Sequence, residues 1–344
     1  MKKYFLVLLT GAALFVGCCN SAKNESCVSA IPVIFETDMG NDIDDALALD
    51  MLYKYADMGV VNLLGVGVNR MDPYSVEFVD VMNTWFGYSD VAIGKITNGV
   101  DCANDPPANF VKTVCLYQEN GVSPFGRTHT DYSQIPEAPD FYRELLAGQP
   151  DSSVVVVSVG FSTNISRLLD TQPDHFSPLT GRDLVAQKVK LLSIMAGNLV
   201  EPTAWEYNVG RDVPAVQNVF NNWPTPIVVS PYDVGEAVKF PASVVENNLD
   251  YAGANPVKIG YESYMQMPYD RPSWDLTSVL YAVEGVENYF NISEWGRIAV
   301  DNEAHTTFHA DKNGRHAYLG VNAEQAELVK NRLIELVSMK PKSK

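Results

Sequence analysis

Short, almost continuously apolar runs alternate with longer amphipathic segments along most of this chain, and this alternation strongly limits the folds it can adopt. Buried strands are rich in apolar and β-branched residues. We expect such strands at residues 31–37, 61–68, 154–159, 189–195 and 227–230. Helical patterns are clearest at residues 44–55, 73–85, 162–169, 213–222 and 323–337. The alternation predicts an α/β protein in which helices cover both faces of a mainly parallel, Rossmann-like sheet.

The body of the chain reads as one large domain. Of the 344 residues, 46% are hydrophobic and 19% are charged, a composition that can bury a large core. No linker, repeat or low-complexity segment divides residues 31–344. Residues 94–139 are rich in Asn, Pro and Gly, and we expect them to form a long irregular insertion that could cover a site.

The N-terminus has the pattern of an export signal. Lys2 and Lys3 precede an apolar run at residues 4–16 that is too short to span a membrane. The run ends in Leu14-Phe15-Val16-Gly17-Cys18, which resembles the lipobox of bacterial lipoproteins. We therefore expect a signal peptide at residues 1–17 and a lipidated tether at residues 18–30. The protein would be anchored to the bacterial cell envelope only through lipid on Cys18; a secreted protein cut elsewhere is the alternative.

The charge balance limits the class of partner. The chain has 25 Lys and Arg against 42 Asp and Glu, a formal charge of −17. Nucleic-acid polymers need an extended basic surface, so we do not expect them as partners. An acidic protein of this kind suits a cation or a neutral small molecule.

Cysteines and histidines give little sign of a zinc site. Cys102 and Cys115 are the cysteines of the body, and neither has a C-x-x-C partner, although the two could form a disulfide in an exported protein. His305 and His309 have the spacing of a helical metal pair, but they flank a Thr-rich, strand-like stretch before the turn residues 311–314. This pattern predicts a β-hairpin with both histidines on its surface.

The first expected strand ends in a cluster of acids. Five carboxylates lie between positions 36 and 45: Glu36, Asp38, Asp42, Asp44 and Asp45. Their mutual repulsion is relieved by a cation, and carboxylate oxygens favour Ca²⁺ or Mg²⁺. The alternative, acids that favour the positive end of a helix dipole, accounts for one or two of them. Because ligands bind beyond the carboxyl ends of parallel strands, we expect a metal and substrate site here.

Several motifs, in order along the chain, resemble those of the inosine-uridine-type nucleoside hydrolase family. Glu36-Thr37-Asp38-Met39-Gly40 and Asp44-Asp45-Ala46 stand where the family has Asp-Thr-Asp-Pro-Gly and Asp-Asp-Ala. Further matches follow at residues 65–69, at 160–164 (Gly-Pro-Leu-Thr-Asn in the family), at 194–198, at 205–208 (Ala-Glu-Phe-Asn in the family) and at 274–275. The resemblance covers nearly the whole mature chain.

The resemblance implies calcium-dependent hydrolysis of the N-glycosidic bond of ribonucleosides to base and ribose, through an oxocarbenium-like transition state. Ca²⁺ would be bound by the carboxylates of Asp38, Asp45 and Asp275 and by the backbone carbonyl of Thr163, with Asp38 also acting as the base. The ribose would contact Asp44, Asn69, Met195, Asn198, Glu206 and Asn208. Asp44 and Asp45 project about 100° apart on a helix, so one can meet the metal and the other a hydroxyl. For the asparagines, loop or capping roles are the alternative.

Two departures from the family pattern concern the length of loops. Two extra residues separate Gly40 from the acid pair, so Asp42 could replace one ligand. We prefer Asp44 and Asp45 because Ala46 follows them as in the family. The loop between Asn198 and Glu206 is also longer than usual.

A third departure concerns the base. Where uridine-cleaving members have His before the last metal-binding Asp, this chain has Trp274, which resembles the purine-preferring branch. Indole can stack on a purine but is too weak an acid to protonate it. The alternative is a Trp packed in the core of a helix that begins near Pro272. We expect a second stacking residue from the 94–139 insertion, with Phe110, Tyr117 and Phe125 as candidates.

Two other functions remain open from the sequence. One is a nucleoside- or ribose-binding lipoprotein without a working base, and the other is an N-glycosidase that acts on another ribosyl compound. Family members are commonly dimers or tetramers, so a homo-oligomer is also open.

Overall fold

The computed structural model describes residues 29–100, 102, 109–201, 203–251 and 253–344. The predicted signal peptide, Cys18 and most of the predicted tether lie outside the described residues, so export and lipid anchoring stay predictions. In the described part of the chain, no helix is long and apolar enough to cross a membrane.

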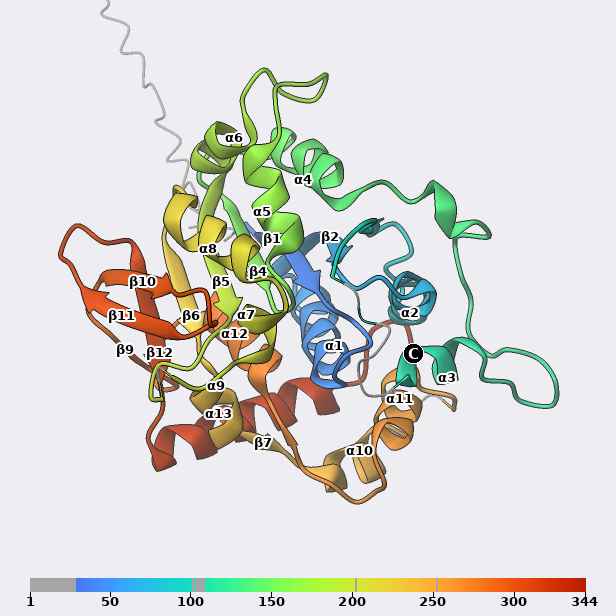
Figure 1. Ribbon diagram of the computed structural model, residues 1–344. Coiled ribbons are helices and arrows are strands. Elements are labelled where there is room, and N and C mark those ends of the chain that lie inside the picture. The colour runs from blue at the N-terminus through green and yellow to red at the C-terminus, as the bar shows by residue number, and fades with distance from the viewer. Residues whose placement is uncertain (1–28, 101, 103–108, 202, 252) are drawn as a thin grey trace, which may run out of the picture.

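A mixed sheet runs through the centre of the molecule, and most of it is parallel (Figure 1). Its parallel part follows the order β3-β2-β1-β4-β5-β6-β12. The bounds are β1 (Ile31–Thr37), β2 (Val61–Val68), β3 (Ala92–Gly94), β4 (Val154–Ser158), β5 (Val189–Met195), β6 (Ile227–Ser230) and β12 (His316–Gly320). The predicted single α/β domain with a mainly parallel sheet is therefore confirmed.

The Thr-rich stretch lies in a β-hairpin, as predicted, but the hairpin turns at residues 301–305 and not at residues 311–314. β11 (Thr306–Ala310) pairs antiparallel with β10 (Gly296–Val300), and β10 lies between β11 and β12. The apolar β12 instead extends the parallel sheet beside β6, which leaves the polar, Thr-rich β11 at the edge. His309 is exposed on β11 and His305 precedes it. Short strands add β9 (Asn291–Ile292) beside β12 and a separate pair, β7 (Lys239–Phe240) with β8 (Arg271–Pro272).

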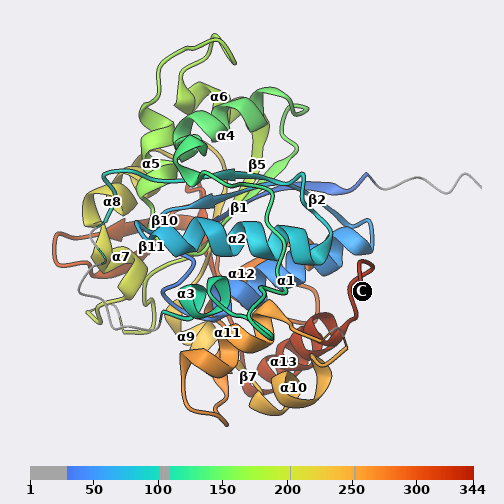
Figure 2. The same cartoon turned by 90° about the vertical axis from the view of Figure 1, so that its right-hand side faces the viewer.

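Helices cover both faces of the sheet (Figure 2). One face carries α1 (Asp44–Asp57), α2 (Pro73–Phe86), α12 (Trp274–Glu284) and α13 (Ala323–Ser338). The other face carries α4 (Ala138–Ala147), α5 (Thr163–Asp170), α6 (Gly181–Lys188) and α8 (Val213–Asn222). The remaining helices are α3 (Phe110–Cys115), α7 (Tyr207–Arg211), α9 (Tyr232–Ala237), α10 (Ala242–Asn248), α11 (Pro256–Tyr264) and a short 3₁₀ turn (Tyr132–Gln134).

The central parallel strands are mostly apolar because they supply the cores on both faces of the sheet. In β1, Val33 and Phe35 belong to the core under α1, whereas Ile34 belongs to the core on the opposite face. Successive side chains of a strand point to opposite faces, so a strand covered on both faces needs an unbroken apolar run.

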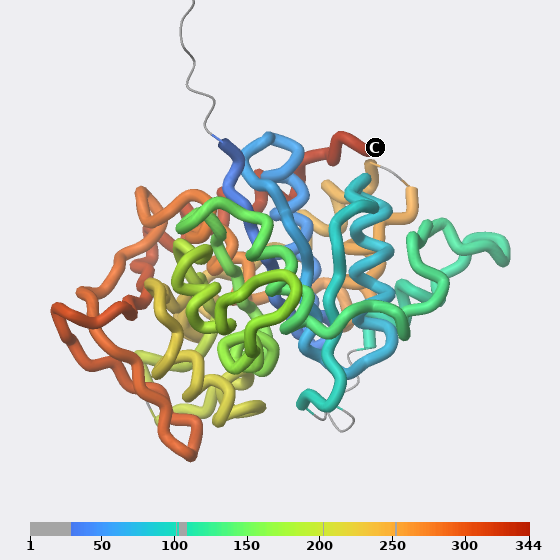
Figure 3. The backbone as a smooth tube through the Cα atoms, turned by 90° about the horizontal axis from the view of Figure 1, so that it is seen from above, coloured from blue at the N-terminus to red at the C-terminus, as the bar shows by residue number. Residues whose placement is uncertain are grey.

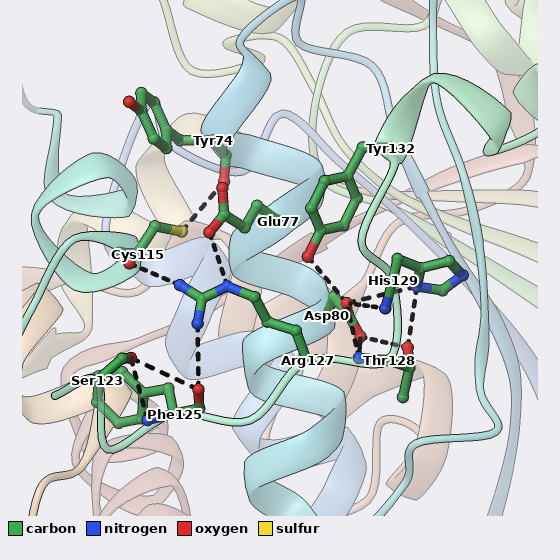
Figure 4. Close-up of polar contacts among 10 residues, drawn as sticks. All are labelled: Tyr74, Glu77, Asp80, Cys115, Ser123, Phe125, Arg127, Thr128, His129 and Tyr132. Carbon is green, nitrogen blue, oxygen red and sulfur yellow. Dashed lines mark hydrogen bonds and ion pairs between the residues drawn. The ribbon is translucent and has the colours of Figure 1, made fainter.

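The described part of the 94–139 insertion after residue 109 lies against α2 and is held there by two carboxylates (Figure 4). Asp80 accepts hydrogen bonds from Thr128, from the backbone of His129 and from Tyr132, over 2.6–3.1 Å. These hydrogen bonds lower the pKa of Asp80, although burial opposes them. Glu77 pairs with Arg127 at 2.7 Å. The loop after α3 projects from the side of the molecule in Figures 1 and 3.

Cys102 and Cys115 are both buried thiols in the structure, which therefore does not contain the disulfide that the sequence left open.

Candidate active site

A cavity of about 340 Å³ opens beyond the carboxyl ends of β1, β4 and β5. The loop after β1 and the first turn of α1 supply its acids, and Val159 and Met195 supply apolar contacts from the ends of β4 and β5. The first turns of α7, α9 and α12 complete the wall. The site therefore lies where the topology of a parallel sheet predicts one.

Three buried aspartates meet in this cavity. One carboxylate oxygen each from Asp44, Asp45 and Asp275 lies within 4.8 Å of the other two. Thr37 donates its hydroxyl to Asp45, and the backbone nitrogen of Asp275 donates to Asp44 at 3.1 Å. Burial raises the pKa of all three carboxyls well above the ordinary value, and the neighbouring negative charges raise it further. Buried, clustered oxygens of this kind fit a hard divalent cation, which would offset the repulsion.

Asp38 stands next to this cluster. Burial raises its pKa to about 7, opposed by the positive charge of Arg70 and assisted by the charges of Asp42 and Glu206. Its Oδ2 atom is buried and has no hydrogen-bond partner among the described residues. Among the described residues, the group of three carboxylates within 4.8 Å of one another contains Asp44 and does not contain Asp38.

Close packing fixes the backbone of Asp38. A Cβ on Gly160, just after β4, would lie 2.4 Å from the Asp38 backbone nitrogen, so only glycine fits at this position. Asn69 packs in the same place and does not line the cavity. Its Nδ2 donates to Glu36 at 2.7 Å and to the carbonyl of Phe161 at 2.9 Å. In this structure Asn69 braces the ends of β1 and β4.

Glu206 and Asn208 form the wall at α7. The Glu206 carboxylate accepts hydrogen bonds from the backbone nitrogens of Gly197 (2.9 Å), Asn208 (2.8 Å) and Val209 (3.1 Å). Burial raises the pKa of Glu206 in spite of these donors. Asn208 donates from Nδ2 to the carbonyl of Val159 at 3.0 Å and to the sulfur of Met195 at 3.1 Å. These bonds tie α7 to the ends of β4 and β5.

The remaining predicted contacts lie beside the cavity rather than in its wall. Thr163 begins α5 and donates its hydroxyl to Asp212 at 2.5 Å. Asn198 accepts from the backbone nitrogen of Glu201 at 2.8 Å, which is the loop role left open from the sequence. The structure thus brings together Asp38, Asp44, Asp45, Met195, Glu206, Asn208, Trp274 and Asp275, whereas Asn69, Thr163 and Asn198 do not line the cavity.

Trp274 lies in the cavity wall at the first residue of α12 and is not fully buried. Its indole nitrogen donates to the carbonyl of Tyr232 at 2.9 Å, and the two rings are 5.5 Å apart between centroids. Gly235 admits the indole, because a Cβ there would lie 2.2 Å from Trp274 Cδ1. One edge of the indole is therefore fixed by α9.

The second aromatic wall does not come from the described residues of the 94–139 insertion. None of Phe110, Tyr117 and Phe125 lines the cavity, and Phe110 and Phe125 are buried in the core. The insertion packs along α2, because its polar loop is bound to Asp80 and Glu77. The other aromatic residues of the cavity come from segments that the sequence did not single out for this role: Trp205, Tyr207, Tyr232 and Tyr264.

Arg271 is a further wall residue that the sequence analysis missed. Its Nε donates to Asp42 Oδ1 at 2.9 Å, and its Nη2 donates to the other oxygen of the same carboxylate. Asp42 is thus paired with an arginine rather than placed among the three clustered aspartates. The one sequence feature that pointed to this ion pair was the extra residue Asp42, and its partner Arg271 lies 229 positions further along the chain.

A parallel sheet with a buried acidic cavity at the carboxyl ends of its strands is typical of α/β enzymes whose carboxylates bind a ligand or a metal ion. Residues 33–327 match the family model described as "Inosine-uridine preferring nucleoside hydrolase". The chain belongs to this family and is an N-glycosyl hydrolase.

Solved structures of several nucleoside hydrolases share the fold. The plant nucleoside hydrolase PpNRh1 has a TM-score of 0.66 at 18% identity, over 90% of this chain and 99% of its own. The inosine-uridine preferring nucleoside hydrolase from Bacillus anthracis has a TM-score of 0.66 at 18% identity, over 89% and 99%. The purine-preferring ribonucleoside hydrolase from Gardnerella vaginalis has a TM-score of 0.66 at 15% identity, over 89% and 99%. Comparison with curated proteins gives no match.

Proposed function

We propose that this protein is a calcium-dependent hydrolase of ribonucleosides that prefers purines and acts in the bacterial cell envelope. The observation that carries the proposal is the meeting of Asp44, Asp45 and Asp275 beside Asp38 at the carboxyl end of the sheet. A ribonucleoside is the substrate class of the family, and its ribose is a neutral polyol that such a cavity can hold.

Calcium is the proposed metal because the donors are buried carboxylate oxygens. Ca²⁺ accepts six to eight oxygen ligands in flexible geometry, whereas Mg²⁺ usually keeps several waters. The carboxylates of Asp38, Asp45 and Asp275 would hold it, and the position of Asp44 supports a contact as well. The carbonyl of Thr163 is the ligand that the family resemblance adds, although Thr163 begins α5 beside the cavity and not in its wall. When bound, the ion would make a nearby water a better nucleophile and would orient the ribose hydroxyls.

Side chains of the protein would supply the general base and would position the sugar. Asp38 has a buried oxygen without a hydrogen-bond partner in the described part of the chain, so it can accept the proton of the attacking water as general base. Asn208 and Met195 would position the sugar, and Glu206 would hold the loop that carries Asn208. Asn69 donates hydrogen bonds to Glu36 and Phe161, so it would act indirectly, by holding the backbone around Asp38 in place.

The preference for purines rests on Trp274 and its neighbours. The indole is fixed at its nitrogen edge by Tyr232 and lines the cavity with four other aromatic side chains. A purine offers a larger π-face than a pyrimidine, so stacking favours it. Export as a lipoprotein follows from the sequence around Cys18, and its role would be nucleoside salvage outside the cytoplasm.

Release of free ribose from a nucleoside panel tests the proposal directly. Purified protein with Ca²⁺ should cleave inosine, adenosine and guanosine faster than uridine and cytidine. A nucleoside- or ribose-binding protein would instead bind the panel without turnover, and an N-glycosidase for other ribosyl compounds would leave all five intact.

A further inference from the structure

Arg271 is the only cation among the described residues that line the cavity. Its guanidinium carbon lies 5.0 Å from the ring centroid of Tyr264 and 5.2 Å from that of Trp274. The positive charge therefore sits against the side chain proposed to stack on the leaving base, in a cavity that otherwise carries negative charge.

Asp42 fixes the direction of this guanidinium. Nε and Nη2 both donate to Asp42, and Nη2 also donates to the Tyr264 hydroxyl at 3.1 Å. Nη1 is not used in this way, because among the described residues its one recorded polar contact is the sulfur of Met265 at 4.0 Å. Burial lowers the pKa of Arg271, but the hydrogen bonds and charge of Asp42 outweigh it and raise the pKa above its ordinary value. Arg271 is thus a permanent hydrogen-bond donor and cannot act as a proton donor.

The reaction needs such a donor. When the bond from C1′ to the base nitrogen breaks, its electron pair stays on the base, and water supplies the hydroxyl that forms the new C1′–O bond. Asp38 takes the proton of that water, and the departing base takes a proton from solvent. Until it does so, the base carries negative charge. Trp274 cannot stabilise this charge through its N–H, because that group already donates to Tyr232.

We propose that Arg271 stabilises the negative charge of the leaving base, with Nη1 donating a hydrogen bond to an acceptor on a purine stacked against Trp274. This inference rests on the proposed nucleosidase function and assigns a leaving-group residue to it. Asp42, one of the two extra residues after Gly40, is the positioning residue that holds the guanidinium in place.

A merely structural role for Arg271, namely neutralising Asp42, makes different predictions. Inosine requires help for its leaving group, whereas 4-nitrophenyl riboside releases a phenolate that is stable without help. Loss of one donor to a developing anion typically costs on the order of 100-fold in kcat. Arg271→Gln should lose about this much on inosine and less than about 5-fold on 4-nitrophenyl riboside.

The double variant Asp42→Asn/Arg271→Gln separates the two roles. It removes the unpaired carboxylate as well as the cation, so a role limited to neutralising Asp42 predicts recovery of inosine turnover. We expect inosine turnover to stay low. Arg332→Gln is the control, because Arg332 also forms partly buried ion pairs, with Glu284 and Glu335, outside the cavity, and the variant should lose neither activity.

Equal losses of Arg271→Gln on both substrates, full activity on inosine, or recovery in the double variant would each overturn the assignment. If Arg271→Gln does not fold, as judged by its thermal transition against Arg332→Gln, Arg271→Lys is measured instead. It keeps the charge but not the two-pronged contact with Asp42, and it should again lose more activity on inosine than on 4-nitrophenyl riboside. A wild-type protein that cleaves neither substrate would contradict the proposed function itself.

Discussion

The backbone nitrogen of Asp275 donates a 3.1 Å hydrogen bond to the carboxylate of Asp44, and this bond joins the first turn of α12 to the first turn of α1. The two residues lie 231 positions apart, yet both helices present an acid to the same point. The cluster of Asp44, Asp45 and Asp275 therefore exists only when α1 and α12 are packed together.

Asp38→Asn should lower kcat by at least about 1,000-fold, because it removes the proposed base and a negative charge beside the cation. Steady-state release of ribose from inosine measures the effect. Asp301→Asn, on the exposed loop between β10 and β11, is the control and should retain wild-type kcat. Near-normal turnover of Asp38→Asn would place the base elsewhere.

Removal of Ca²⁺ by a chelator should abolish ribose release and lower Tm together, because an ion that binds only the folded protein stabilises it. Added Ca²⁺ should restore both quantities, and Mg²⁺ should restore them less well. Calorimetry and the ribose assay on the same sample provide the comparison. Full turnover without bound metal would contradict the metal assignment.

The stability of the metal-free protein should fall as pH rises. Burial raises the pKa of Asp44, Asp45 and Asp275 well above 3.8, and that of Asp38 to about 7. The folded state then binds more protons than the unfolded state, so this stability is fully present below about pH 3.9 and is lost as pH rises through the folded-state pKa values. Chelator-treated protein should have a higher Tm at pH 5 than at pH 8.

Calcium should remove most of that pH dependence, because the bound ion favours the charged carboxylates. Thermal scans with and without Ca²⁺ at the two pH values make the comparison. A metal-free Tm that rises between pH 5 and pH 8 would show that these four carboxyls do not dominate the linkage.

Trp274→Ala should lower kcat/KM for inosine and guanosine by about 10-fold or more and affect uridine less, because it removes the stacking surface of the base. Trp295→Ala is the matched control, since Trp295 is exposed and does not line the cavity. A Trp274→Ala enzyme with unchanged purine kinetics would argue against stacking while leaving the hydrolase function intact.

Mature protein isolated from the native envelope should begin at Cys18 and carry lipid on that residue. Intact-mass and peptide mass spectrometry test both points. An intact leader, or an unmodified Cys18, would contradict the proposed lipid anchor.

The sequence was informative where a feature depends on neighbouring residues. The strands β1, β2, β4, β5 and β6 follow from apolar runs, and the acids around Asp44 follow directly from the end of β1. Pairing between distant segments was not visible in the same way. The position of β12 beside β6, which places the turn of the hairpin at residues 301–305 rather than at 311–314, depends on a burial preference that operates only in the folded sheet.

The same limit applies to the cavity wall. Asp42 was recognised as an extra acid, but its pairing with Arg271 depends on the placement of β8, for which no local pattern was evident. Likewise, the irregular composition of the insertion at 94–139 is compatible with two positions, one over the cavity and one along α2. Hydrogen bonds to Asp80 decide between them.

The hydrogen bonds of this insertion to Asp80 and its ion pair with Glu77 also offer a site for attaching a label to the protein. Arg127, Thr128 and His129 hold one side of the projecting loop, and α3 holds the other, so the exposed turn at residues 120–121 is separated from the cavity by fixed points on both sides. A peptide tag or a fluorescent label introduced at this turn would alter neither the acids nor the aromatic wall. The enzyme can therefore be attached to a surface by this loop with its cavity still open to substrate.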